Sequence, residues 1–302
     1  MKVSYLFLII GLLFIGCKND TTQSLVSEGL SKNYKDASAM YDQSPNESTA
    51  QSLLSSIRQE LKATTDKSMK ETLLNRGLKV AEEQKNGSIA VAYLMPLVKD
   101  YQTNIGENTA KLASALLDLG QADPGNILAK AYLEKYPNQE YTELISKKKS
   151  IDIDNIDTFL LKKAKMIFEN PDQFGINRKN AQKYVDACES YVLAYPKKDN
   201  APEYLYKAAE MSRTLKTYGK CLNIYDWILT KYPTYSKAPT TMFLKGFMLE
   251  NELGDKPTAK TVYQDFLKTY PDSDLKDDVQ FLLENIDKSE EEIMKMIENK
   301  KG

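Results

Sequence analysis

The sequence predicts an all-α protein in which antiparallel helix pairs stack side by side as a right-handed solenoid. Three observations support this fold class. Apolar residues recur at helical spacing along most of the chain, several helical segments end in a Tyr-Pro pair, and the later pairs recur at a nearly constant interval. Pro196 and Pro233 are 37 residues apart, and Pro233 and Pro271 are 38 apart, which is the length of a two-helix unit. The apolar content of 42% fits such a stack, because each unit buries its apolar face only against its neighbours.

The Tyr-Pro segments share one pattern. Counted back from the proline, positions −5, −4 and −1 hold apolar or aromatic residues, which lie on one face of a helix. The proline then ends the helix, because it lacks an N–H and disfavours helical geometry in the residue before it. The four segments are Tyr132–Pro137, Tyr191–Pro196, Ile228–Pro233 and Phe266–Pro271. A fifth segment, Leu97–Gln102, has the same shape without the proline.

Residues 180–290 resemble tetratricopeptide repeats. Ala201–Ala209 and Ala238–Gly246 are similar to the opening of the first helix of such a repeat, with Ala209 and Gly246 at the small-residue position. The subtype is similar to that of envelope lipoproteins of the β-barrel assembly machinery and of the Tol–Pal-associated periplasmic protein. Further matching positions are the small residues Cys221 and Ala259, the aromatic residues Tyr225 and Tyr263, the turn Leu253–Asp255 and the closing helix Leu275–Leu283.

Upstream of residue 180 the pattern is weaker, and we expect degenerate repeats over 47–150. The stripe Ala50, Leu53, Leu54, Ile57, Leu61 predicts a hairpin over 47–85, and 110–119 with 127–136 predict another helix pair. The interval from Pro137 to Pro196 is 59 residues, so we interpret it as one repeat with an insertion. Residues 151–302 are then the C-terminal repeats with a capping helix.

The N-terminus resembles a bacterial lipoprotein signal. A basic start is followed by an apolar run over 3–15 and by Gly16-Cys17. Thirteen helical residues span about 20 Å, too little for a hydrocarbon core of about 30 Å. We therefore predict a signal peptide over 1–16, lipidation at Cys17 and a polar tether over 17–46, with outer-membrane sorting favoured by Lys18. An ordinary signal peptide or a buried N-terminal helix stays an alternative.

Composition argues against several function classes. The chain has no histidine, which removes the commonest catalytic base and zinc ligand. It also lacks the glycine motifs that cradle phosphates. Lys and Arg number 41 against 42 Asp and Glu, so no overall positive field attracts nucleic acid. We expect no catalytic residue, no metal site, no cofactor and no nucleic-acid partner.

The family resemblance implies a partner-binding groove on the first helices of two units. The groove residues it implies, taken by position, are Tyr206, Glu210, Arg213, Phe243, Phe247 and Glu250, flanked by Glu203 and Thr240. Aromatic and Arg residues are frequent hot spots of interfaces. The alternative for Tyr206 and Phe243 is that they pack between repeats.

The sequence therefore predicts a membrane-anchored scaffold that binds an envelope protein or peptide. The alternative is a glycan-capture lipoprotein of an outer-membrane importer, which the single Trp227 and the short loops disfavour; an enzyme is the third possibility. Cys188 and Cys221 are expected to be buried thiols, and a disulfide between them stays open because export permits one.

Overall fold

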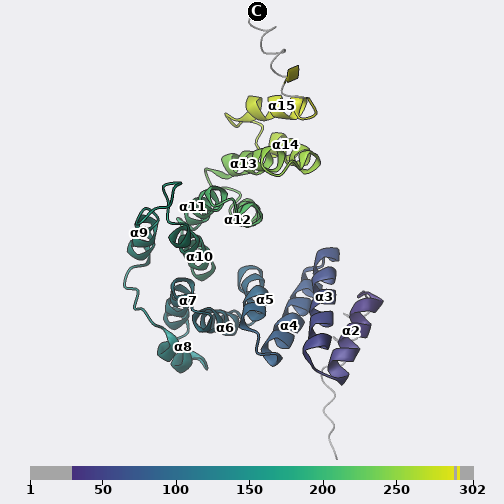
Figure 1. Cartoon of the computed structure of the whole chain (residues 1–302), viewed down its shortest axis with the longest axis vertical. Coiled ribbons are helices and arrows are strands. Elements are labelled where there is room, and N and C mark those ends of the chain that lie inside the picture. The colour runs from purple at the N-terminus through teal and green to yellow at the C-terminus, as the bar shows by residue number, and fades with distance from the viewer. Residues whose placement is uncertain (1–28, 289–290, 293–302) are drawn as a thin grey trace, which may run out of the picture. The chain divides into compact units, whose positions relative to one another are not determined.

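The computed structural model describes residues 29–288 and 291–292, all of whose regular structure is helical (Figure 1). The chain divides into two compact units, Met1–Tyr93 and Leu94–Gly302, with the boundary inside helix α5 (Gly87–Asp100). The predicted signal peptide and Cys17 lie outside the described residues. Among the described helices, none combines the length and the apolar character needed to cross a bilayer.

Unit 1 is built from α2 (Lys32–Gln43), α3 (Glu47–Ala63), α4 (Lys67–Glu83) and the first part of α5. Helix α2 packs on α3, and α3 packs on α4. Part of the stretch predicted to be a polar tether is thus a packed helix, because α2 contributes Tyr41 to the interior at 1% exposure. The Tyr41 hydroxyl donates to Glu83 at 2.7 Å, which ties α2 to the end of α4.

A glycine–tyrosine contact recurs in both units. A Cβ placed on Gly77 of α4 would lie 2.3 Å from the Tyr93 ring of α5. In unit 2, a Cβ on Gly246 of α13 (Ala238–Asn251) would lie 2.5 Å from the Tyr263 ring of α14 (Lys256–Thr269). In each case glycine lets the paired helices approach closely at an aromatic ring. Gly246 therefore has the close-packing role that the repeat pattern predicts, whereas the Gly77 contact was not predicted.

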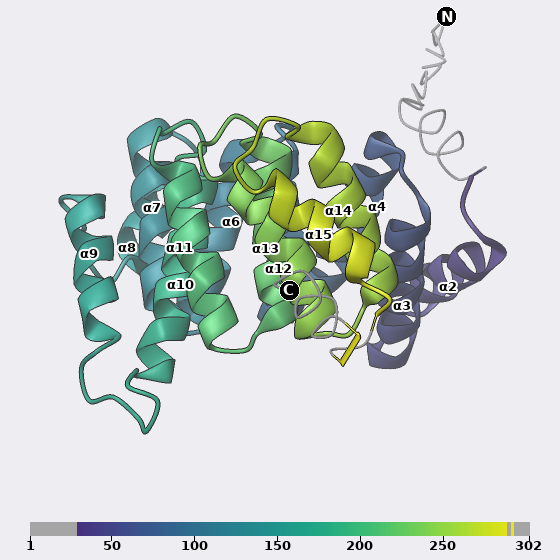
Figure 2. The ribbon, with the colours of Figure 1, turned by 90° about the horizontal axis from the view of Figure 1, so that it is seen from above.

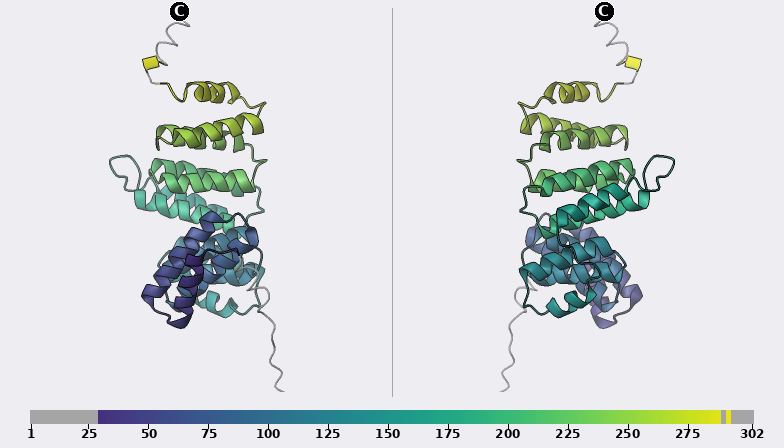
Figure 3. Two further views of the ribbon diagram at one scale, coloured as in Figure 1. Left: turned by 90° about the vertical axis from the view of Figure 1, so that its right-hand side faces the viewer. Right: turned by 90° about the vertical axis from the view of Figure 1, so that its left-hand side faces the viewer.

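The second half of unit 2 is a regular stack. Helix α11 (Ala201–Thr214) pairs with α12 (Tyr218–Lys231), and α13 pairs with α14. Helix α15 (Lys276–Asn285) covers α14 as the last layer, and Figure 3 shows these layers one above another. Pro at the first turn of α11, α13 and α14 suits a helix start, because the missing N–H would have no partner there. Phe266, Tyr263 and Val279 are fully buried between the last layers.

The first half of unit 2 is interrupted. Helix α6 (Ile105–Asp118) pairs with α7 (Ala122–Lys135), but the next helix to pack on α7 is α10 (Arg178–Ala194). Between them, α8 (Thr142–Lys148) packs on α6 and α7, and α9 (Ile156–Met166) packs on α10. Figure 2 shows α9 on the outer side of α10. Two inserted helices thus separate α7 from α10 in sequence, while α7 and α10 remain neighbours in space.

The loop between α9 and α10 carries exposed aromatic side chains. Helix α9 ends at Met166, and the chain then turns through Asn170, which has a φ of +50°. Backbone bonds close the loop, with the Asn177 N–H donating to the Ile167 carbonyl at 2.6 Å. Phe168 and Phe174 remain 66% and 71% exposed on it.

Both described cysteines are free and buried, Cys188 on α10 and Cys221 on α12. Burial raises the pKa of the Cys188 thiol to about 12 and that of Cys221 to about 11. Each fills a small apolar position, as the sequence predicts, because a free cysteine packs like a small hydrophobic residue.

Candidate functional site

The structure places the predicted groove residues on α11 and α13 and uses several of them for packing. Tyr206 is buried, its ring 6.4 Å from that of Tyr235, with the Lys237 ammonium 4.6 Å above it. The neighbouring Glu203 accepts from the Tyr235 hydroxyl and from Lys237 at 3.0 Å. This part of the predicted groove therefore joins one repeat to the next.

The α13 residues of the predicted groove differ in exposure. Phe243 packs against the core of the last layers, and Glu250 accepts from the Tyr263 hydroxyl at 2.8 Å. Phe247 is 37% exposed with its ring 6.0 Å from that of Phe243. With Glu210 and Arg213 on α11, which are also exposed, Phe247 forms the accessible remainder of this surface.

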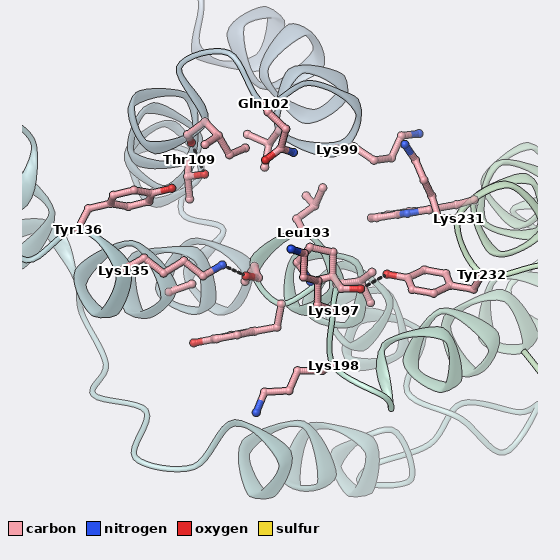
Figure 4. A pocket seen from close by; sticks show the side chains of 18 residues that line it. Lys99, Gln102, Thr109, Lys135, Tyr136, Leu193, Lys197, Lys198, Lys231 and Tyr232 are labelled. Atoms are coloured by element: carbon pink, nitrogen blue, oxygen red, sulfur yellow. Dashed lines mark hydrogen bonds between the residues drawn. The ribbon is translucent and has the colours of Figure 1, made fainter. Parts of the chain in front are cut away.

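A second feature of unit 2 is a cavity of about 620 Å³ where the ends of α5, α7, α10 and α12 meet (Figure 4). We call it the lysine cavity. Its wall is formed by Val98, Lys99, Gln102, Ile105, Thr109, Ala131, Lys135, Tyr136, Val192, Leu193, Ala194, Tyr195, Pro196, Lys197, Lys198, Trp227, Lys231 and Tyr232. None of the predicted groove residues belongs to this wall.

The lysine cavity is built from the Tyr-Pro ends of the repeats. The motif tyrosines Tyr136, Tyr195 and Tyr232 follow α7, α10 and α12 and all lie in the wall. The Tyr232 hydroxyl donates to the Pro196 carbonyl at 2.9 Å, which joins two of these ends. The Tyr195 hydroxyl donates to Glu134 at 2.7 Å. These bonds hold the helix ends around the cavity.

The floor of the cavity is apolar. Val192 and Ala131 are almost fully buried, and Trp227 is 7% exposed. The Lys99 ammonium lies 5.3 Å from the centre of the Trp227 ring, a cation–π contact that covers this ring. Trp227 is therefore part of the wall and not an open stacking platform.

The rim of the cavity is positively charged. The wall holds five lysines and no Asp or Glu, in a chain whose total charges nearly cancel. Asp100, just outside the wall, pairs with Lys231 at 2.8 Å and with Lys99 at 3.7 Å. One carboxylate is thus shared by two of the five lysines, and the cavity keeps an excess of positive charge.

Figure 4 shows Lys135 on the opposite side of the cavity from Lys99 and Lys231, with Lys197 between them. The Lys135 ammonium donates to the Ala194 carbonyl at 2.5 Å and lies 5.5 Å from the centre of the Tyr195 ring. Burial lowers the pKa of Lys135; the nearby Glu134 opposes this effect and the like charge of Lys197 adds to it. Lys135 and Lys197 therefore form a second positive cluster in the same cavity.

The Tyr-Pro motif predicts helix ends, and its pattern alone did not predict the cavity. A signal was present, because lysine stands directly before the motif tyrosine at Lys135 and Lys231, and Lys99 stands two before Tyr101 in the fifth segment. What could not be predicted was that these ends converge, since α7 and α10 are separated by two inserted helices.

Among the described residues, no group of three or more Cys, Asp or Glu side chains is arranged to hold a metal ion. The lysine cavity combines positive charge with apolar surface, an arrangement that can bind a ligand.

Comparison with known proteins supports the repeat assignment. A profile of the tetratricopeptide repeat family matches residues 240–273, which include most of α13, all of α14 and the turn after it. No curated protein matches the chain in sequence. Among solved structures, the chain is similar to the "TPR2AB-domain:pHSP90-complex of yeast Sti1", at 10% identity over 87% of this chain and 99% of that one, with a TM-score of 0.32. Residues 240–273 thus match a tetratricopeptide repeat, within a chain whose described elements are all helices.

Proposed function

We propose that this protein is a membrane-anchored tetratricopeptide scaffold that binds a partner protein of the cell envelope through the lysine cavity of unit 2. The observation that carries the proposal is the cavity itself, about 620 Å³ with an apolar floor and a cationic rim. Binding sites commonly combine such a volume with apolar lining and a few convergent polar groups. The repeat at 240–273 supports a role in protein–protein interaction.

The anchoring part of the proposal rests on the sequence. The apolar run before Gly16-Cys17 and the polar residues after it support lipidation at Cys17 and attachment to the outer membrane, facing the periplasm. The absence of histidine and of phosphate-binding glycine motifs supports a scaffold rather than an enzyme.

The glycan-capture alternative has less support. Stacking on a sugar needs an open aromatic face, and the one tryptophan is buried under Lys99. The exposed Phe168 and Phe174 lie on the loop before α10 and outside the lysine cavity.

Partner binding can be tested by site-specific cross-linking in cells. A photoreactive amino acid in place of Lys197, at the cavity, is expected to give a discrete adduct that mass spectrometry identifies. The same amino acid in place of the exposed Lys179, at the other end of α10, is the matched control. Equal adducts from both positions, or none from Lys197, would refute the cavity as the binding surface.

Anchoring is tested separately. Metabolic labelling with a fatty acid is expected to mark the wild-type protein and not Cys17→Ser, which should leave the membrane fraction. A Cys17→Ser protein as membrane-bound as the wild type would refute the lipoprotein assignment.

A further inference from the structure

We propose that the lysine cavity recognises an acidic segment of its partner, an extended stretch in which carboxylates flank a bulky apolar residue. This inference rests on the proposed function and specifies the chemistry of the partner. It follows from the arrangement of charge, the apolar floor and the absence of Asp and Glu from the cavity wall.

The charges are divided between two sides of the cavity. Lys99 and Lys231 share Asp100 on one side, Lys135 stands on the other, and Lys197 lies between them (Figure 4). A single small anion can neutralise one side only. A segment with acidic residues at two positions can reach both, and charges of opposite sign attract most strongly where water is partly excluded.

The apolar floor selects what lies between the carboxylates. Val192, Ala131 and Trp227 are buried beneath the rim, so an apolar side chain that enters the cavity meets apolar groups and removes its own apolar surface from water. A purely ionic ligand would leave this floor unused.

Helix capping is a simpler explanation for the lysines, but it accounts for only some of them. Cations stabilise helix C-termini, and Lys135 does bond the Ala194 carbonyl at the end of α10. Lys197 and Lys198 follow the end of α10, are exposed, and make no ion pair in the described part of the chain. Capping explains Lys135, whereas Lys197 and Lys198 remain available to a ligand.

A protein segment fits better than a nucleic acid. The chain carries a formal net charge of −1, and Glu134 and Asp100 stand directly beside the cavity. A chain with nearly balanced charge has no overall positive field to attract a long polyanion, whereas the five lysines of the cavity can pair with the carboxylates of a short acidic segment.

The single tryptophan makes the test specific, because Trp227 lies in the cavity wall and no other tryptophan contributes to the emission. The full chain in detergent is titrated with the capped peptide Asp-Glu-Glu-Leu-Leu-Glu-Asp while tryptophan fluorescence is followed. Two matched peptides replace either the acids by amides or the two leucines by serines. We expect saturable binding of the first peptide and affinities lower by about tenfold or more for both others.

Two variants complete the test. The double variant Lys197→Glu, Lys231→Glu is expected to weaken binding of the acidic peptide by about tenfold or more. Lys179→Glu is the control, with the same type of charge reversal outside the cavity. Circular dichroism and melting confirm that both variants are folded. Unchanged affinity in the cavity variant of a folded protein would overturn the proposal.

The competing outcomes are distinct. Equal binding of acidic and amide peptides, with cross-linking at Lys197 intact, would overturn the acidic segment but leave the scaffold function standing. Tighter binding of a single-stranded oligonucleotide, or the same spectral change with inorganic phosphate at equal ionic strength, would also overturn it. Absence of a cross-linked adduct from the photoreactive amino acid at position 197 in cells would instead refute the proposed function.

Discussion

The two halves of unit 2 use the same helix-ending motif with different results. In the regular half, α11 to α15 follow one another in space as in sequence, and the motif residue Tyr270 packs on the core beside Phe266, with ring centres 5.5 Å apart. In the interrupted half, α8 and α9 are displaced from the stack and α10 lies directly on α7. There Tyr136 and Tyr195 keep the same contact with the preceding aromatic ring, at 5.4 and 5.5 Å, but they also line a cavity, together with Tyr232 at the end of α12. The comparison shows that a packing motif becomes a site when an insertion changes which ends meet.

The largest expected effect concerns the regular half. Phe266→Ala removes a fully buried ring and is expected to lower the free energy of unfolding by about 3–5 kcal/mol. Since each repeat contacts only its neighbours, hydrogen exchange should rise in α13–α15 and stay nearly unchanged in α6 and α7. Phe174→Ala, on the exposed loop, is the matched control and should change stability by no more than about 0.5 kcal/mol. Equal loss of protection in α6 and α7 would contradict a repeat-by-repeat organisation.

The second effect tests the glycine–tyrosine contact. Gly246→Ala would place a Cβ against the buried Tyr263 ring and is expected to lower the free energy of unfolding by about 1–3 kcal/mol. Gly219→Ala in α12 meets nothing within 4 Å and should be neutral or slightly stabilising, since alanine restricts the unfolded chain. Urea unfolding of both variants makes the comparison. A neutral Gly246→Ala would show that α13 and α14 do not depend on close approach.

A third prediction separates the predicted groove from the lysine cavity. Phe247→Glu changes a residue that is 37% exposed, so we expect melting to change little. Recovery of the partner by affinity purification should fall less than in the double variant Lys197→Glu, Lys231→Glu. A larger loss from Phe247→Glu would place the main contact on α11 and α13, as the family resemblance implies, because exposed aromatic residues there would then be the hot spot.

The smallest expected effect concerns the reactivity of the two buried thiols. Burial raises the pKa values of Cys188 and Cys221 to about 12 and 11, so at pH 8 very little of either is the reactive thiolate. A thiol reagent should react slowly with folded Cys17→Ser protein and rapidly with two thiols after denaturation. Fast reaction of the folded protein would show that these helices open, and no reactive thiol after denaturation would show a disulfide instead.

Much of the fold could be predicted from local sequence. The Tyr-Pro pairs stop helices through a steric property of proline, so α7, α12 and α14 end within two residues of Pro137, Pro233 and Pro271. Periodicity indicated which face of each helix is buried, and Tyr225, Tyr263 and Phe266 are indeed fully buried. These features depend on neighbouring residues in the chain, so the sequence by itself determined them.

The lysine cavity was decided only by the tertiary structure. Lys99, Lys135, Lys197 and Lys231 come from segments that are up to 132 residues apart, and each alone is an ordinary residue at or beyond a helix end. They become a site because α10 packs on α7 across the inserted α8 and α9. Local pattern cannot show this packing, since the contact joins helices whose separation in sequence exceeds one repeat. The apolar stripe of a helix indicates that this face must be buried. Which other helix packs on it depends on the packing of the whole fold.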